Sequence, residues 1–557
     1  MIRRARTVGS LFAALLLAAC ATTPAPSSPS AALTLHLIGI NDFHGNLDAP
    51  RNGMTVADPA DPTKTRQVPA GGAARLATVV KQLRARDPAH TLMVGAGDLV
   101  GASPLLSSLF HDEPTVDALS GMGLALTAVG NHEFDEGPAE LKRLQNGGCH
   151  PVDGCKGPEP FTGARYQYLA ASTVETATGK TLFPAYAVRE FDGIKVGFIG
   201  LTLKSTPDFV APSGTAGLTF GDEAETVNAL VPVLRGQGVE AIVVLIHEGG
   251  FPAAGAGDCP DISGPITEIA PKLDRAVDMV VSGHTHRAYV CTIGGRLVTS
   301  AGLYGMMATD ITLTLDRRTR DVVAARARNV LIGQDIVEDG ETKALIDRYR
   351  VLAAPLMNRV VGKITATLTT AGAANGESQL GEIVADSMRA AAAKAVGEPI
   401  DIAFMNGPGL RGALVLKGEG EVSYADIFAV QPFNNTLVVM TLTGADILKL
   451  LDQQFDDIGP KAVLQVSDGF AYAWGRTGDG AAVVAGSVTV GGKPLDPDAR
   501  YRIVTNNFLA EGGDFFTAFK AGTDEKIAGA DSAALEDWLA ARSPLGPPLL
   551  NRIRLEP

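Results

Sequence analysis

The sequence predicts an α/β fold that is divided into more than one domain. Five short apolar runs, rich in β-branched residues, are typical of buried strands: 34–40, 91–94, 124–129, 241–246 and 279–281. Each run is followed directly by a cluster of polar residues. A chain of 557 residues with 46% hydrophobic residues is long enough for two or more domains with large cores.

The amino-terminal residues predict an export signal. Three arginines precede an apolar stretch from Leu11 to Ala19, which ends in Leu17-Ala18-Ala19-Cys20. This ending is similar to a bacterial lipobox, so we expect residues 1–20 to be a lipoprotein signal peptide and Cys20 to carry a lipid. An ordinary signal peptide is the alternative. Residues 21–33, rich in Pro, Ser, Thr and Ala, would form a flexible tether, which places the protein on the cell membrane or outer membrane, facing the periplasm or the exterior.

The polar clusters after the five strands contain the donor atoms of a metal centre. Ligand sites in open sheets lie beyond the carboxyl ends of the strands, so the clusters should converge. Zinc and manganese accept imidazole nitrogen and carboxylate oxygen, and the clusters offer both. The candidate ligands are Asp42, His44, Asp98, Asn131, His247, His284 and His286.

Two metal ions about 3.5–4 Å apart need a shared carboxylate, for which Asp98 is the candidate. Because alternate residues of a strand point to the same side, Asp42 with His44, and His284 with His286, would act as pairs. Each cluster taken singly has an ordinary explanation, such as a turn at Gly130-Asn131. Five of the nine histidines nevertheless fall in these clusters, namely the four candidate ligands and His132, and this concentration favours the metal centre.

With these residues the sequence resembles the calcineurin-like metallophosphoesterases, and more closely the exported 5'-nucleotidase family, which includes UDP-sugar hydrolases and cyclic phosphodiesterases. The resemblance covers about residues 34–557. It implies a four-layer α-β-β-α metallophosphoesterase sandwich followed by a C-terminal α/β nucleotide-binding domain. It also implies two divalent metal ions, zinc, manganese or similar. One would be held by Asp42, His44, Asp98 and His286, and the other by Asp98, Asn131, His247 and His284.

The resemblance further implies a catalytic pair, His132 and Asp135. A protonated imidazole that is oriented by a carboxylate can stabilise charge on phosphate oxygens or protonate the leaving oxygen. The alternative is that Asp135 only caps a helix that begins near Pro138.

The second half of the chain predicts a separate substrate-binding domain. Residues 316–328 are charged and turn-like, and helical spacing over 338–354 indicates a linker helix. A strand over 360–369 and a helix over 380–395 should follow. We therefore expect a metallophosphoesterase domain at 34–335, a linker helix at 336–357 and a C-terminal domain at 358–557.

Three loops of the second half resemble the substrate loops of the family: 405–411, 431–435 and 507–514. Phe433 and Phe508 would stack on the two faces of a base, and each face contributes about 1–3 kcal/mol. Core packing would explain one phenylalanine alone, but both lie in loops rich in Gly, Asn or Pro. Arg411 would meet the phosphate. The remaining substrate contacts implied are Asn406, Asn435 and Asp514.

One position departs from the family pattern. Family members often carry a further arginine just before the helix that begins near Leu380, whereas this chain has residues 371–376 without any charge. One phosphate contact is therefore missing, which leaves room for esters with other groups on phosphorus.

The charge balance argues against nucleic acid polymers as partners. The net charge is −13, and it is −16 without residues 1–20, which hold three arginines and no acid. The sequence has no basic stripe, so a polyanion would be repelled, although small phosphates can bind at local metals.

The four cysteines that remain after lipidation allow three disulfide pairings. Cys149 and Cys155 flank a Pro/Gly loop, which favours Cys149–Cys155 with Cys259–Cys291. A structural zinc is less favoured, because no C-x-x-C spacing occurs.

The expected function is nucleotide catabolism: release of phosphate from nucleoside 5'-monophosphates by attack of metal-bound hydroxide, in a monomer whose partners are small nucleotides. A UDP-sugar or NAD pyrophosphatase and a 2',3'-cyclic-nucleotide phosphodiesterase are alternatives. The sulfur-oxidation hydrolase branch is disfavoured by the Phe433 and Phe508 clamp. A lipid-anchored binding protein without turnover is the remote alternative.

Overall fold

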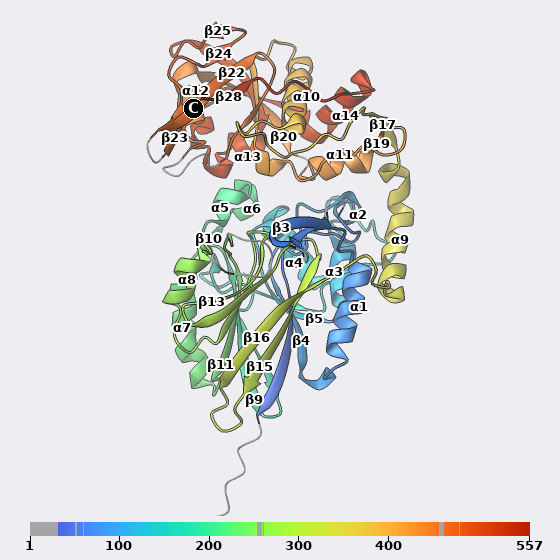
Figure 1. Ribbon diagram of the computed structural model, residues 1–557, viewed down its shortest axis with the longest axis vertical. Coiled ribbons are helices and arrows are strands. Elements are labelled where there is room, and N and C mark those ends of the chain that lie inside the picture. The colour runs from blue at the N-terminus through green and yellow to red at the C-terminus, as the bar shows by residue number, and fades with distance from the viewer. Residues whose placement is uncertain are drawn as a thin grey trace, which may run out of the picture.

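The computed structural model describes residues 32–50, 53–58, 61–252, 259, 261–433, 435–455, 462–477 and 480–556. They form two bodies, joined along one side by the long helix α9 (Gly340–Met357) (Figure 1). The predicted signal peptide, Cys20 and all but the last two tether residues lie outside the described residues. Within the described ranges, no helix is both long and apolar enough to cross a membrane.

Two six-stranded sheets form the centre of the amino-terminal body. The first has the order β16-β15-β1-β4-β5-β6: β1 (Leu33–Ile40), β4 (Thr91–Ala96), β5 (Leu124–Ala128), β6 (Gln167–Leu169), β15 (Met307–Leu315) and β16 (Val322–Leu331). The second has the order β13-β14-β12-β11-β9-β8: β8 (Tyr186–Phe191), β9 (Ile194–Thr202), β11 (Ala241–His247), β12 (Met279–Ser282), β13 (Ala288–Ile293) and β14 (Arg296–Ala301). The five predicted strands are confirmed as β1, β4, β5, β11 and β12.

The two sheets pack face to face through an apolar core. Leu35 and Val94 of the first sheet join Phe198, Val243 and Val281 of the second, and all five are almost completely buried. Helices cover both outer faces: α1 (Ala73–Arg84), α3 (Glu113–Met122) and α4 (Gly137–Asn146) lie on the first sheet, and α7 (Glu223–Gly236) and α8 (Ile266–Lys272) on the second. Helix α9 packs against α1 and α3 from outside. Strands buried on both faces are apolar throughout, as these are. The predicted four-layer α-β-β-α sandwich is confirmed.

Two predictions about local structure were wrong. Residues 322–331 form strand β16, although residues 316–328 were expected to be a charged connector. This strand lies at the edge of its sheet, where one face is exposed and charged residues are tolerated. The strand expected over 360–369 is only β17 (Val360–Lys363), because its partner β19 (Glu421–Ser423) is three residues long.

Helix α9 lies where a linker helix was expected. Asp339 accepts a hydrogen bond from the backbone N–H of Thr342 and so caps its first turn. Beyond it, the carboxyl-terminal body is built on a five-stranded sheet in the order β21-β18-β26-β20-β27. These strands are β18 (Ile402–Met405), β20 (Thr436–Thr443), β21 (Gln465–Val466), β26 (Arg500–Asn506) and β27 (Thr523–Ala530).

Helices α10 (Gln379–Val396) and α14 (Asp531–Arg542) pack on this sheet. The first lies where a helix was predicted. A smaller sheet contains β22 (Phe470–Thr477), β23 (Gly480–Val483), β24 (Thr489–Val490), β25 (Lys493–Pro494) and β28 (Ile553–Glu556). The carboxyl-terminal body sits over the end of the sandwich where the parallel strands finish, with α11 (Tyr424–Val430) and α13 (Asn507–Ala510) on the side facing it (Figure 1). The three predicted substrate loops lie on this side too, since they line cavities between the two bodies.

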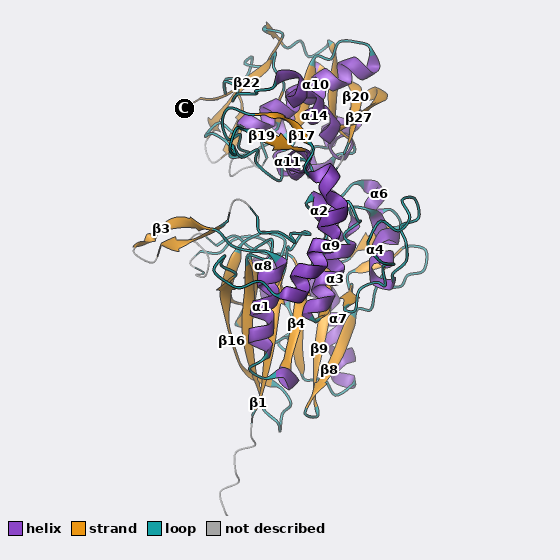
Figure 2. Cartoon of the chain, turned by 90° about the vertical axis from the view of Figure 1, so that its right-hand side faces the viewer, coloured by secondary structure: helices purple, strands orange, loops and turns teal. Residues whose placement is uncertain are grey.

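A hairpin and two disulfides complete the amino-terminal body. The hairpin of β2 (Met54–Asp58) and β3 (Asp61–Val68) projects sideways beneath the carboxyl-terminal body (Figure 2). The predicted disulfides Cys149–Cys155 and Cys259–Cys291 are confirmed. The second one joins the segment before α8 to β13, which follows the loop that carries His284 and His286.

Candidate metal centre and substrate cavity

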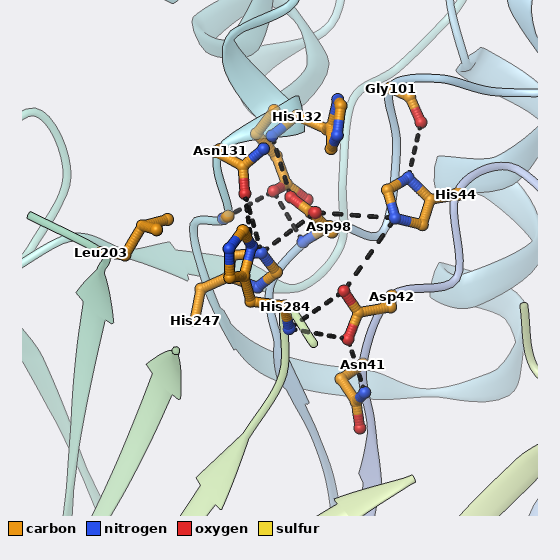
Figure 3. Close-up of polar contacts among 12 residues, drawn as sticks. Asn41, Asp42, His44, Asp98, Gly101, Asn131, His132, Leu203, His247 and His284 are labelled. Carbon is orange, nitrogen blue, oxygen red and sulfur yellow. Dashed lines mark hydrogen bonds and ion pairs between the residues drawn. The ribbon is translucent and has the colours of Figure 1, made fainter. Parts of the chain in front are cut away.

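The seven predicted metal ligands lie together at the carboxyl ends of the strands. Figure 3 labels all of them except His286. They come from the loops after β1, β4, β5 and β12 and from the last residue of β11. Asp42, His44, Asp98, Asn131 and His247 are at most 1% exposed. Residues separated by up to 244 positions therefore share one buried site.

The donor atoms form two adjacent groups. In the first, Nε2 of His286 lies 3.1 Å from Nε2 of His44 and 3.5 Å from Oδ1 of Asp42. In the second, the donor atoms of Asp98, His247 and His284 all lie within 4.8 Å of one another. The carbonyl oxygen of the Asn131 side chain lies 3.1 Å from Nε2 of His247 and 3.1 Å from Nδ1 of His284.

Asp98 lies between the two groups. Its Oδ2 atom is 3.0 Å from Nε2 of His247 in one group and 3.6 Å from Nε2 of His44 in the other. One carboxylate oxygen therefore faces both groups, which is the position that a bridging ligand requires.

The pairing of His284 with His286 that strand alternation predicts is wrong, because the two histidines fall into different groups, as the resemblance to the family implied. The prediction assumed the alternation of a strand, but both residues lie in the loop after β12 with left-handed backbones, at φ 71° and 58°. Asp42 and His44 do share a group, although they too lie in a loop, at φ 47° and 46°. Loop geometry rather than strand alternation decides which donors meet.

Backbone carbonyls orient two of the imidazole rings. Nδ1 of His44 donates to the carbonyl of Gly101 at 2.9 Å, and Nδ1 of His247 donates to the carbonyl of Ala96 at 2.8 Å. These bonds fix Nδ1 of each ring as a donor, so that Nε2 is the nitrogen that can bind a metal once it carries no proton. Neither carbonyl could be identified from the sequence, since backbone atoms carry no residue signal.

Glu133 is a further residue that the sequence reasoning did not assign. Its buried carboxylate accepts hydrogen bonds from the backbone N–H groups of Asp98, Leu99 and Gly130, at 2.8, 2.8 and 2.6 Å. It therefore joins the loop of Asp98 to the loop of Asn131. The only sequence signal was an acidic residue within an otherwise assigned cluster.

The charge state of the histidines suits a cation site. Burial lowers the pKa of His44 and His286, and it lowers that of His284 to about 3, so that these rings are neutral and can donate lone pairs. Burial also disfavours charge on His247, but the carboxylate of Asp98 outweighs it and raises the pKa of His247 to about 10. A proton and a divalent cation would compete for Nε2 of His247, the nitrogen that faces Asp98. Neutral imidazoles, two carboxylates and one amide fit a pair of divalent metals.

His132 and Asp135 form the predicted pair. Nδ1 of His132 lies 3.0 Å from both carboxylate oxygens of Asp135. Asp135 is not the cap of the following helix, because α4 begins at Gly137 with Glu136 in the capping position. Although burial by itself favours the neutral ring, Asp135 and Asp98 raise the pKa of His132 above its ordinary value.

A cavity of about 520 Å³ between the two bodies joins the metal cluster to the predicted substrate residues. It is lined by the following residues of the carboxyl-terminal body: Asn406, Arg411, Phe433, Asn435, Phe508 and Asp514. The guanidinium of Arg411 is important here, because Nε and Nη2 are buried without a hydrogen-bond partner among the described residues.

The two predicted aromatic residues both line this cavity, in different surroundings. The Phe433 ring stacks on the His132 ring, with centroids 5.7 Å apart and an interplanar angle of 24°. The Phe508 ring lies directly against Gly513, where even a Cβ atom would clash. Asn406 donates to Oδ2 of Asp514 at 2.7 Å, so these two polar side chains support each other.

Two other aromatic residues next to the cluster were missed. Phe209 makes an edge contact with His284 and, from the amino-terminal body, with Phe515 of the other body. Tyr304 lies edge-on to His44, at 5.8 Å between centroids. The sequence held no signal for either, since isolated aromatic residues are most often core residues.

Two family models match successive parts of the chain. The model of calcineurin-like phosphoesterases matches residues 35–288, and the model of the 5'-nucleotidase C-terminal domain matches residues 360–521. Among solved structures, a 5'-nucleotidase precursor of Thermus thermophilus is 26% identical, covers 94% of this chain and 100% of its own, and superposes with a TM-score of 0.73. The sulfate thiohydrolase SoxB of Thermus thermophilus, at 17% identity and a TM-score of 0.69 over 96% of this chain and 98% of its own, shares the fold alone.

Similarity to individual proteins also extends over most of this chain. The cell wall protein Lmo0130 of Listeria monocytogenes is 33% identical over 87% of this chain, and endonuclease YhcR of Bacillus subtilis is 32% identical over 87%. This chain spans only 64% and 38% of those two proteins. The 5'-nucleotidase of Vibrio cholerae is 26% identical over 95% of this chain and 94% of its own length. The chain thus belongs to the 5'-nucleotidase family of metallophosphoesterases.

Proposed function

We propose that the protein releases phosphate from nucleoside 5'-monophosphates with the help of two divalent metal ions. The observation that carries the proposal is the single cavity that joins the donor cluster, the His132–Asp135 pair and the loops of the carboxyl-terminal body. A small phosphate ester in this cavity would reach all three at once.

The first metal would be held by Asp42, His44, Asp98 and His286, and the second by Asp98, Asn131, His247 and His284. Such a pair supplies a hydroxide near neutral pH and withdraws charge from phosphate oxygens. The four imidazole donors support zinc as the bound metal, and the carboxylate and amide oxygens support manganese as the alternative.

His132 would act on the phosphate from the side of the leaving group. Because Nδ1 is engaged by Asp135, the ring presents Nε2 to the cavity that it lines. From there it can donate a hydrogen bond to a phosphate oxygen or a proton to the departing 5'-oxygen. Asp135 holds the ring in this orientation and stabilises its protonated form.

Arg411 and the aromatic residues would hold the rest of the substrate. A buried guanidinium with unpaired N–H groups is costly unless an anion satisfies them, and a phosphate oxygen does so. Phe433 and Phe508 would stack on the base, and Asn435 and Asp514 would bond the base or the ribose. Asn406 supports Asp514.

The test is product detection with AMP, UMP, UDP-glucose, NAD and 2',3'-cyclic AMP, using residues 33–557 with added manganese or zinc. We expect phosphate release from AMP and UMP, and a loss of at least 100-fold in kcat for His132→Gln at equal metal content. Turnover of the cyclic diester alone would replace the proposal by the phosphodiesterase alternative. Turnover of none of the five would support a binding protein.

We also propose the domain division 34–335, 336–357 and 358–557, and export of a monomer with a lipid on Cys20. The support is the sequence of residues 1–33 and the two disulfides, which persist in oxidising compartments. Labelled palmitate should enter the wild-type protein in cells but not the Cys20→Ser variant. Equal labelling of both would refute the anchor.

A further inference from the structure

The peptide group between Gly101 and Ala102 lies between the metal cluster and the His132–Asp135 pair. Its carbonyl oxygen accepts the hydrogen bond from Nδ1 of His44 at 2.9 Å, which Figure 3 shows as a dashed line. Its N–H group, on Ala102, donates to Oδ2 of Asp135 at 3.0 Å. The orientation of this one peptide therefore acts both on a candidate metal ligand and on the carboxylate that orients His132.

The backbone on either side of this peptide is in an uncommon conformation. Gly101 and Ala102 both lie in the left-handed region, at φ 82° and 49°. A Cβ atom on Gly101 would lie 2.1 Å from the carbonyl oxygen of His132, so only glycine lets the chain pass this close. An alanine with positive φ is strained, and such a conformation persists only where neighbouring groups fix it.

Asp112 supplies a fixing contact from the other end of the same loop. Its Oδ2 atom accepts a hydrogen bond from the backbone N–H of Gly101 at 3.1 Å. Its Oδ1 atom accepts one from the hydroxyl of Ser107 at 2.6 Å, and that hydroxyl lies 2.6 Å from the hydroxyl of Thr115 in α3. Asp112 is 6% exposed, and Ser107 and Thr115 are completely buried. The carboxylate thus ties the N–H of Gly101 to fixed groups of the core.

The ordinary role of an aspartate at this position is not the one that the structure shows. Asp112 directly precedes α3, and an aspartate before a helix usually caps the first turn with its side chain. Here the side chain makes no capping hydrogen bond to the helix. Its two oxygens are directed to Gly101 and Ser107 instead.

We propose that Asp112 is a positioning residue for the first metal. Through the N–H of Gly101 it fixes the carbonyl that orients His44, and so it raises the affinity of the site formed by Asp42, His44, Asp98 and His286. This inference rests on the proposed function, because it takes His44 as a ligand of that metal.

The effect should be confined to one of the two metal sites. The second site has its own backbone support, since Nδ1 of His247 donates to the carbonyl of Ala96 and not to Gly101. Asp112 is also outside both groups of donor atoms. Loss of its carboxylate should therefore weaken the first site and spare the second.

The experiment is titration of the full chain, stripped of metal, with Mn²⁺ alone, with bound ions counted by equilibrium dialysis. Burial raises the pKa of Asp112 to about 6, so the titration is run at pH 8, where the side chain is a carboxylate. The test variant is Asp112→Gly, because glycine adopts the φ of 60° at this position without strain. We expect one of the two binding steps to weaken about 10- to 100-fold and the other to stay as in the wild type.

Two further variants make the result specific. Asp112→Asn keeps an oxygen that can accept from Gly101, and its NH₂ group can donate to the hydroxyl of Ser107, so both binding steps should be retained. The matched control is Asp524→Gly, which removes an exposed aspartate that also has a left-handed backbone, at φ 56°, in β27 of the other body. It should leave both steps unchanged.

The outcomes separate this inference from the proposed function. Two unchanged binding steps in Asp112→Gly would refute the positioning role, and so would equal weakening of both steps. Asp112→Asn that binds as weakly as Asp112→Gly would refute it as well, because the acceptor for Gly101 is still present. A wild-type protein that binds two ions but releases no phosphate from AMP would refute the proposed function and leave the role of Asp112 in metal binding intact.

Discussion

Glu133 offers the sharpest test of how the metal cluster is held in place. Its carboxylate accepts three backbone N–H groups from the loops of Asp98 and Asn131 and is 4% exposed. Burial raises the pKa of Glu133 to about 8, so the comparison is made at pH 9, where the group is charged in the folded protein. A hydrogen bond to a charged group contributes about 1.5–3 kcal/mol, and a buried donor left without a partner costs a similar amount. Glu133→Ala removes all three bonds, so we expect the free energy of unfolding to fall by about 4 kcal/mol or more.

Glu133→Gln should be milder, for a geometric reason. One carboxylate oxygen accepts from Asp98 and Gly130, and the other accepts from Leu99. An amide keeps one acceptor oxygen, so it can retain the first two bonds while its NH₂ group faces the N–H of Leu99. The expected loss is about 1.5–3 kcal/mol.

The assay is urea unfolding of the metal-free full chain, because bound metal would add its own stabilisation to the folded state. The matched control is Glu190→Ala, an exposed glutamate of β8, which should change the free energy of unfolding by no more than about 0.5 kcal/mol. Metal affinity should fall about 10- to 100-fold in Glu133→Gln, since supporting contacts of this kind orient the ligands. If Glu133→Ala unfolds within about 1 kcal/mol of the wild type, the carboxylate does not hold the two loops together.

Three other predictions follow from the structure. Phe433→Ala and Phe508→Ala should each raise KM for AMP about 5- to 150-fold while sparing a small aryl phosphate, and equal losses on both substrates would contradict base stacking. Asp98→Asn should lose both metal ions in elemental analysis, whereas retained stoichiometry would contradict the bridging position. Burial raises the pKa of Asp278 to about 7, so the folded protein keeps a proton that the unfolded chain releases near pH 4. The stability from this group is therefore complete below pH 4 and is lost as the pH rises through 7. Asp278→Asn can keep the bond to the N–H of Ile242, so its Tm should vary less than that of the wild type between pH 5 and 8, and parallel curves would contradict the assignment.

The strands of the sandwich and the position of the site could be predicted because both are local properties of the chain. A strand buried on both faces is apolar along its whole length, so β1, β4, β5, β11 and β12 were visible as runs. The polar clusters follow these runs directly, and parallel strands end on one edge of the layered sandwich. The sequence also predicted the disulfides, and the resemblance to the family predicted the four layers.

The edge strand β16 was missed for the opposite reason. Its charged residues are tolerated only because one face is open to solvent, and that depends on which strand lies beside it. The grouping of His284 with His247, and of His286 with His44, depended in the same way on left-handed loop residues that no alternation rule describes.

By itself, the sequence determined which residue types reach the metal site and which strands carry them. The resemblance to the family already implied how the donors divide into two groups. Only the tertiary structure decided that Glu133 joins two of the loops and that Phe433 lies against His132. The physical reason is that periodicity and composition report on a residue's own strand, whereas distances between loops of two bodies depend on how the whole chain packs.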